Sequence, residues 1–166
     1  MRNFVVFLML FLSTHFVLGQ NWGIQTSMLV QPIKKSFDNR FDGASFQMYY
    51  KKTFYEKLHF IAGIEGQINS WGNHVLLIVG GEYIYFKNER WSSNVRLNIG
   101  NGIALFQPNL LYSFNSKGQI FWNYRTKKQN IWGIGVGLQL MITPEYKSYS
   151  SIYSTVNVPV TLQYNF

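Results

Sequence analysis

Three ionisable residues in this chain have types and spacing that could support chemistry: Glu65, Glu82 and Arg96. Each occupies a polar position in a segment where apolar and polar residues alternate, so all three share one face of successive strands. If the chain turns tightly at residues 87–90, Glu82 and Arg96 face each other across a ladder, with Glu65 one strand away. The three then form a buried ion-pair network or, in the sharper alternative, a relay for protons or solutes.

Candidates for general-base or nucleophilic chemistry are few. His59 and His74 lie outside the N-terminal segment, and Ser70 is close to His74 in sequence, but no Asp or Glu is near it and no His-x-Ser motif is present. The chain has no cysteine, which excludes disulfides, zinc–thiolate sites and thiol chemistry. The sequence therefore predicts no enzyme activity, no cofactor and no metal.

The segments that must position these residues have a period of two. The pattern is clearest from Val156 to Phe166, where even positions are apolar or aromatic and odd positions are polar or proline. Turn residues separate eight such segments, at 22–30, 44–54, 58–69, 74–86, 91–105, 110–125, 130–142 and 156–166. The sequence predicts an all-β fold, an eight-stranded antiparallel up-and-down transmembrane β-barrel. Residues 106–118 are either one long loop or part of the sixth strand, because Asn115–Gly118 is a turn signal.

Composition and charge favour a membrane over water. The chain is 18% aromatic and 13% charged, whereas soluble domains are about 25% charged. On the proposed lipid face the sequence places one ionisable residue, Lys52, close to a strand end. The alternative is a soluble barrel of the lipocalin kind, with the apolar face of each strand inside. It is disfavoured because the opposite face carries apolar residues that suit a packed interior: Leu29, Ile61, Leu76, Ile78, Ile84, Phe86 and Phe121.

Aromatic residues recur at the strand ends that we expect to face the periplasm, as at a headgroup boundary. The predicted girdle consists of Trp22, Phe54, Tyr85, Trp91, Trp122, Tyr124, Trp132, Tyr164 and Phe166. Glycines repeat on the inward face of the fifth and seventh strands, at Gly100, Gly102, Gly133, Gly135 and Gly137. We expect them to make room for bulky neighbours such as Phe121 or Tyr49, with a small internal pocket as the alternative.

The formal net charge of +8 invites a nucleic-acid interpretation. The cations do not cluster on one helix and no recognition motif is present, so we predict no nucleic-acid partner. Cations instead ring the expected periplasmic end, where they would face anionic headgroups: Lys51, Lys52, Lys57, Lys87, Arg90, Arg125, Lys127 and Lys128. At the other end, cations that could meet lipopolysaccharide phosphates are Lys34, Lys35, Arg40 and Lys147.

Residues 1–19 have the features of a secretory signal peptide. Arg2 supplies the positive end, an apolar run follows, and Val17 and Gly19 are small enough to precede a cleavage site. The run is shorter than the roughly 20 residues that a membrane-spanning helix needs. The predicted domain organisation is therefore a signal peptide at 1–19 and an outer-membrane barrel domain at 20–166.

The alternating terminal strand and its final Phe resemble the terminal signal of bacterial outer-membrane barrels. The whole pattern is similar to the small OmpX/OmpA-type family. The resemblance implies a closed barrel in a Gram-negative outer membrane. It also implies a signal read by the barrel-assembly machinery, at Val158, Val160, Leu162, Tyr164 and Phe166.

We therefore predict a non-enzymatic structural, adhesive or envelope-assembly role. The expected partners are outer-membrane lipids, lipopolysaccharide, the assembly machinery and an envelope protein. The alternatives are transport through a narrow lumen and, less favoured, lipid modification. A barrel of eight strands is only just wide enough for its own side chains, which favours a structural role for the inward charges.

Overall fold

The computed structural model describes residues 21–32, 41–69, 72–106, 109–144 and 152–166. The predicted signal peptide and the cations Lys34, Lys35, Arg40 and Lys147 lie outside these residues. The described chain forms eight strands, β1 (Trp22–Val30), β2 (Phe41–Tyr55), β3 (Leu58–Asn69), β4 (Gly72–Lys87), β5 (Trp91–Phe106), β6 (Asn109–Arg125), β7 (Ile131–Pro144) and β8 (Ile152–Asn165). No helix in this part of the chain is long and apolar enough to cross a membrane.

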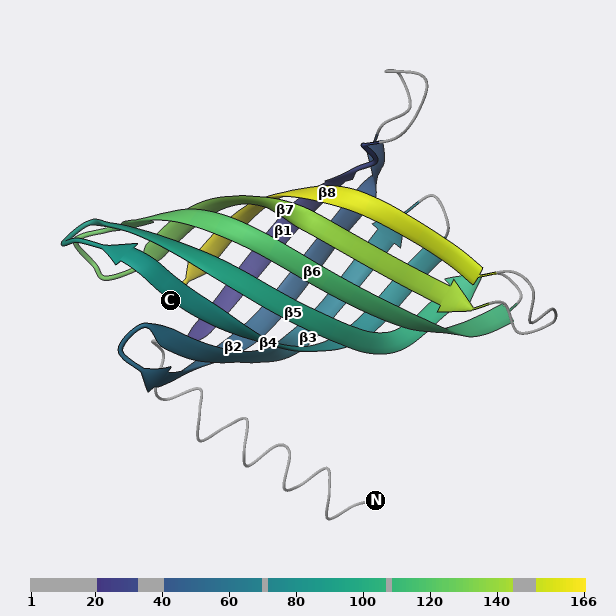
Figure 1. Cartoon of the computed structure of the whole chain (residues 1–166), viewed down its shortest axis with the longest axis horizontal. Helices are drawn as coiled ribbons and strands as arrows, with labels where there is room; N and C mark the ends of the chain where they lie inside the picture. Colours follow the sequence, from purple (N-terminus) through teal and green to yellow (C-terminus); the bar gives the residue numbers. More distant parts are fainter. Residues whose placement is uncertain (1–20, 33–40, 70–71, 107–108, 145–151) are drawn as a thin grey trace, which may run out of the picture.

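The eight strands close into a barrel. Each strand pairs with the next in sequence, all pairs are antiparallel, and β1 pairs with β8 from Gly23↔Asn165 to Val30↔Val158. Figure 1 shows the strands running obliquely around the barrel, the tilt that closure requires. Because closure leaves no strand edge unpaired, every ladder hydrogen bond is made within the wall. The predicted fold class is confirmed.

The period of two determines which side chains face into the barrel. On β7 the outward residues Ile134 and Leu138 are 59% and 64% exposed, while Gly135 and Gln139 between and beside them are buried. The same alternation holds on β8, where Leu162 is exposed and Thr161 and Gln163 are buried. The polar face therefore lines the interior, and the apolar face forms the outside of the barrel.

The uncertain connection between the fifth and sixth strands is resolved in favour of pairing. β5 and β6 pair without a register shift from Phe106↔Asn109 to Trp91↔Tyr124. Residues 115–118 lie within this ladder, so the long-loop alternative for 106–118 is wrong. Partners on β5 and β7 hold both sides of this segment, and the paired ladders override its local turn propensity.

The last residues of β4 depart from the expected alternation. The register with β5 shifts between Ile84 and Phe86, which marks a β-bulge. Phe86 is consequently 49% exposed, so the prediction that it packs inside the barrel is wrong. Ile84 precedes the shift, pairs with the buried Asn94 and is half-buried. A bulge adds a residue to one strand, and from that point inward and outward positions no longer follow the parity of the sequence.

Large interior side chains fit because glycines lie beneath them. A Cβ on Gly135 would meet the ring of Phe121, as the sequence predicts for that pair. Tyr49 covers Gly23 on the neighbouring strand β1 rather than one of the predicted glycines. Both rings are fully buried, so they fill the lumen instead of bordering an open channel.

Candidate functional site

An ion pair between β4 and β5 lies inside the barrel, nearer the end of β4 than its start. Glu82 and Arg96 are direct partners in the ladder, and both are 0% exposed. Arg96 donates to Glu82 Oε2 from Nη2 at 2.6 Å and from Nε at 3.1 Å. The pair is short and charge-assisted, and burial makes it costly to lose either partner alone.

The remaining surface of the guanidinium is covered by neutral groups. Nη1 donates to Gln25 Oε1 and Nη2 to Gln163 Oε1, each at 2.9 Å. The Arg96 Cζ lies 4.6 Å from the centre of the Tyr49 ring and 4.7 Å from that of Phe121. Two aromatic faces therefore sandwich the cation while amide oxygens satisfy its N–H groups. We call this group, with Glu82, the Arg96 plug.

Lys51 extends the plug toward one end of the barrel. Its Nζ donates to Glu82 Oε1 at 2.8 Å, and its side chain is 17% exposed. Glu82 thus receives one cation on each carboxylate oxygen, and the three side chains carry a net charge of +1. The sequence places Lys51 among cations facing headgroups, whereas its side chain enters the lumen.

Glu65 does not join the predicted network. It pairs with Lys117 of β6, and both side chains are 1% exposed. His59 is the residue opposite Glu82, and Glu65 lies six positions beyond it on β3, roughly 20 Å away along the strand. Lys117 was missed because it lies in the apparent turn at 115–118, although its odd parity with Phe121 places it inside.

Polar side chains bridge opposite walls of the barrel. Gln25 of β1 donates to Gln119 of β6 at 3.2 Å, and Gln119 donates to Thr161 of β8 at 2.7 Å. Ser27 and Thr161 hydroxyls are 2.8 Å apart. All four residues are buried. Strands that are not neighbours in the sheet are therefore linked through the lumen, which the ladder alone could not achieve.

A second polar cluster lies where β2, β4, β6 and β7 approach the other end. His74 Nδ1 is 3.1 Å from Ser113 Oγ, and Ser113 Oγ is 3.5 Å from Thr143 Oγ1. Asp42 accepts from Gln31 and Asn157 at 2.9 and 3.0 Å. The predicted neighbour of His74, Ser70, lies outside the described residues. Ser113 is 0% exposed, so no substrate can reach its hydroxyl from outside in this conformation.

The outward surface is a continuous apolar band. Exposed side chains near the middle of the strands include Ile64, Leu77, Leu97, Ile120, Ile134, Val136, Leu138 and Leu162. The exposed ionisable residues of the described strands are Lys52 and Lys87, both near strand ends. Such a surface cannot be in contact with water across its whole circumference, and it matches a hydrocarbon environment.

Aromatic side chains gather at one end, which we call the short-turn end. It holds the turns at 56–57, 88–90 and 126–130, the start of β1 and the end of β8. Ring pairs there are Trp91–Tyr124 at 5.0 Å, Trp132–Tyr164 at 4.6 Å and Tyr164–Phe166 at 5.0 Å. Phe54, Tyr85 and Trp122 are also exposed, and Trp22 makes an edge-to-face contact with Tyr50, with ring centres 5.5 Å apart. The outward positions are those of an interfacial belt.

The first four residues of the predicted assembly signal lie on the outward face of β8, and Phe166 directly follows the strand. Val160, Leu162 and Phe166 are 48%, 57% and 46% exposed, while Val158 and Tyr164 are half-buried. β8 pairs with β7 on one side and β1 on the other, so this face is the part of the strand that closure leaves accessible.

No protein-family model and no curated protein matches the chain. Among solved structures it is similar to the outer-membrane protein Ail of Yersinia pestis in a phospholipid bilayer nanodisc. The identity is 11%, the TM-score is 0.39, and the match covers 88% of this chain and 99% of that one. The barrel assignment depends on the strand pairings and not on this likeness.

Fold and surface together define a class. The chain is a membrane barrel of the outer-membrane type, with an apolar outer band, an aromatic belt at the short-turn end and a lumen filled by side chains. This is the architecture that the resemblance to small outer-membrane barrels implies.

Proposed function

We propose that the chain is an integral outer-membrane protein with a non-enzymatic structural, adhesive or envelope-assembly role. Its short-turn end would face the periplasm. The Arg96 plug carries the proposal, because a fully buried arginine held between two rings supports a lumen that is closed at this level. A protein whose lumen is closed acts through its surfaces, its lipids and its loops rather than by transport.

The competing role is conduction through a narrow lumen. The purified protein is reconstituted into planar bilayers, and we expect no steady single-channel current. Removing the plug in the variant Tyr49→Ala/Arg96→Ala/Phe121→Ala should give discrete openings, which shows that the assay detects this barrel when it is open. Steady, ion-selective wild-type channels that Glu82→Ala abolishes would refute the non-conducting role.

Lipid modification has one specific observation in its favour, the contact between His74 and Ser113. Against it, Ser113 is fully buried, and both oxygens of Asp42 already accept from amide groups. Lipid A from cells with and without the protein is compared by mass spectrometry. We expect identical profiles, whereas an acyl change lost in Ser113→Ala would establish an enzyme.

The proposed partners are outer-membrane lipids and lipopolysaccharide, the assembly machinery and an envelope protein. The apolar band supports lipid contact over the whole outer wall. A pull-down from outer membranes in mild detergent separates the remaining roles. A stoichiometric protein partner supports envelope assembly, and its absence together with binding of cells to a host or abiotic surface supports adhesion.

A further inference from the structure

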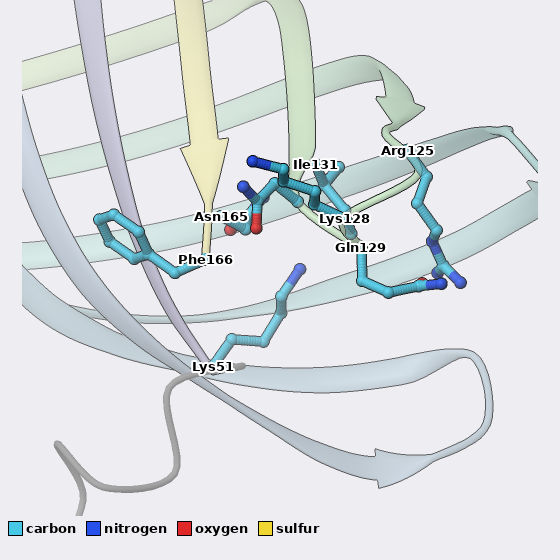
Figure 2. Close-up of a pocket in the computed structure, with 8 residues that line it drawn as sticks. Lys51, Arg125, Lys128, Gln129, Ile131, Asn165 and Phe166 are labelled. Carbon is cyan, nitrogen blue, oxygen red and sulfur yellow. The ribbon is translucent and has the colours of Figure 1, made fainter.

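A pocket of about 360 Å³ opens at the short-turn end, beside the mouth of the lumen. Three cations line it, Lys51, Arg125 and Lys128, together with Asn165 and Phe166. None of the side chains that line it is acidic. Figure 2 shows Lys51 and Lys128 reaching toward Asn165 from different elements, with Arg125 and Gln129 on one side and the Phe166 ring turned away.

Lys51 connects this pocket to the Arg96 plug. One of its three N–H donors goes to Glu82 Oε1. Glu82 is already neutralised by Arg96, so Lys51 presents uncompensated positive charge toward the pocket. A single buried carboxylate between two cations leaves the site attractive to a further anion.

Asn165 supplies an oriented donor. Its Oδ1 accepts from the Tyr49 hydroxyl at 2.6 Å, which fixes the amide so that Nδ2 is the remaining group. Nδ2 is buried and has no hydrogen-bond partner among the residues that the structure describes, and Asn165 as a whole is only 5% exposed. The amide sits against Gly23, where a Cβ would collide with Oδ1. A buried donor without a partner is costly and uncommon, so a ligand that accepts from it gains free energy.

Lys128 and Arg125 complete the positive rim. Neither forms an ion pair with any residue that the structure describes. Lys128 lies in the turn between β6 and β7, and Arg125 is the last residue of β6. Lys127, which is next to Lys128 in the same turn, does not line the pocket.

We propose that this pocket binds an oxyanion of the phosphate class, held by Lys51 Nζ, Asn165 Nδ2 and Lys128 Nζ, with Arg125 at the rim. Cationic donors and a neutral N–H donor converging from separate elements suit a tetrahedral anion with several acceptor oxygens. The phosphate could belong to a soluble molecule or to a lipid headgroup at the same membrane surface. The site does not depend on which envelope role the barrel has.

The test measures binding of inorganic phosphate to the full chain folded in uncharged maltoside micelles. Calorimetry at constant ionic strength gives the affinity, and the NMR signals of the Asn165 side-chain NH₂ report the site. We expect saturable binding that shifts these signals. Lys128→Gln should weaken it about fivefold, and Asn165→Asp, which keeps the acceptor for Tyr49 but removes the donor, should weaken it by more than about tenfold.

Lys127→Gln and Lys52→Gln are the matched controls, since each removes a nearby cation that does not line the pocket. Both should change the affinity by less than about twofold. Lys128→Gln alters an exposed turn residue, so this variant folds even if Asn165→Asp does not. Absence of saturable binding, or equal weakening by Lys127→Gln and Lys128→Gln, would overturn the site.

Two lipid conditions identify the source of the phosphate. The wild-type chain is placed in nanodiscs of phosphatidylcholine alone and of an equimolar mixture with phosphatidylglycerol. Maltoside micelles are the phosphate-free reference, since both lipids carry a phosphodiester. An Asn165 shift that appears in either nanodisc without added phosphate, and that phosphate does not increase, assigns the site to a headgroup. A shift that needs added phosphate in both nanodiscs assigns it to a soluble anion. No shift under any condition contradicts the proposal.

Discussion

Arg96 and Glu82 are opposed residues of adjacent strands, with Nη2 of one 2.6 Å from Oε2 of the other and neither side chain exposed. This ion pair is the central contact of the Arg96 plug. Around it the aromatic rings of Tyr49 and Phe121 close on the guanidinium. At this level the lumen is therefore filled by the ion pair and the groups around it, and the outside of the barrel carries the apolar surface that most folds bury.

Removal of both members of this pair should cost less than the sum of the two single removals. Glu82→Gln leaves Arg96 and Lys51 without their carboxylate and should cost about 3–5 kcal/mol. Arg96→Met leaves Glu82 with Lys51 as its remaining cation, so it should be destabilising but less so. The double variant should lose less than the sum of the two. The measurement is reversible urea unfolding in micelles, followed by tryptophan fluorescence. Lys52→Gln, on the outward face, serves as control and should stay within about 0.5 kcal/mol. Additive losses would show that the pair is not coupled.

The glycine beneath Phe121 offers a matched pair of substitutions. Gly135→Ala places a methyl group against the buried ring and should destabilise the barrel by about 1–3 kcal/mol. Gly66→Ala adds the same group on the outward face, where nothing lies within 4 Å of the new Cβ, and should be close to neutral. The same unfolding assay measures both. Equal effects would mean that the ring moves freely and that the plug is loosely packed.

The free-energy cost of placing a charged side chain on the outward face should depend on its depth in the bilayer. Leu138→Arg, in the middle of β7, should destabilise folding into lipid vesicles by about 2–4 kcal/mol. Ser154→Arg, on the outward face near the start of β8, should cost about 0–1 kcal/mol. The fraction folded is read from gel mobility with and without heating. Similar costs at the two positions would argue that the band does not face hydrocarbon.

The outward face of β8 should govern insertion in cells. If the assembly machinery reads the terminal residues, Phe166→Ala or Tyr164→Ala lowers the folded protein in the outer membrane several-fold without changing the stability of refolded protein to the same degree. Val156→Ala lies on the same face of β8 but outside the predicted signal. Quantitative blotting of membrane fractions makes the comparison. A loss of the same size for Val156→Ala would mean that the effect is general to the strand.

Much of the architecture could be predicted because the apolar and polar residues that alternate in the sequence face outward and inward in turn along each strand. Leu97, at an apolar position of the alternation, faces outward, and Gln119, at a polar position, is buried inside. Parity fails at Phe86, where a bulge shifts the register. The inward position of Lys117 was also hard to predict, because the turn-forming residues around it suggest a loop where the structure has a strand.

The interior contacts could be predicted only in part. Glu82 and Arg96 meet because a tight hairpin fixes their register, which sequence spacing can suggest. The partners of Glu65 and the amides around Arg96 come from strands across the lumen. Those contacts depend on the stagger and tilt of all eight strands at once, and no single segment of the sequence carries that information.

The most direct test of the account asks which side chains touch lipid. The chain contains no cysteine, so single variants Leu97→Cys, Val136→Cys, Gln119→Cys and Thr161→Cys each carry one fluorophore after folding into vesicles. Quenchers attached to lipid acyl chains are then added. We predict strong quenching at positions 97 and 136 and little at 119 and 161. Quenching at 119 and 161 with none at 97 and 136 would contradict a barrel whose apolar face meets the membrane.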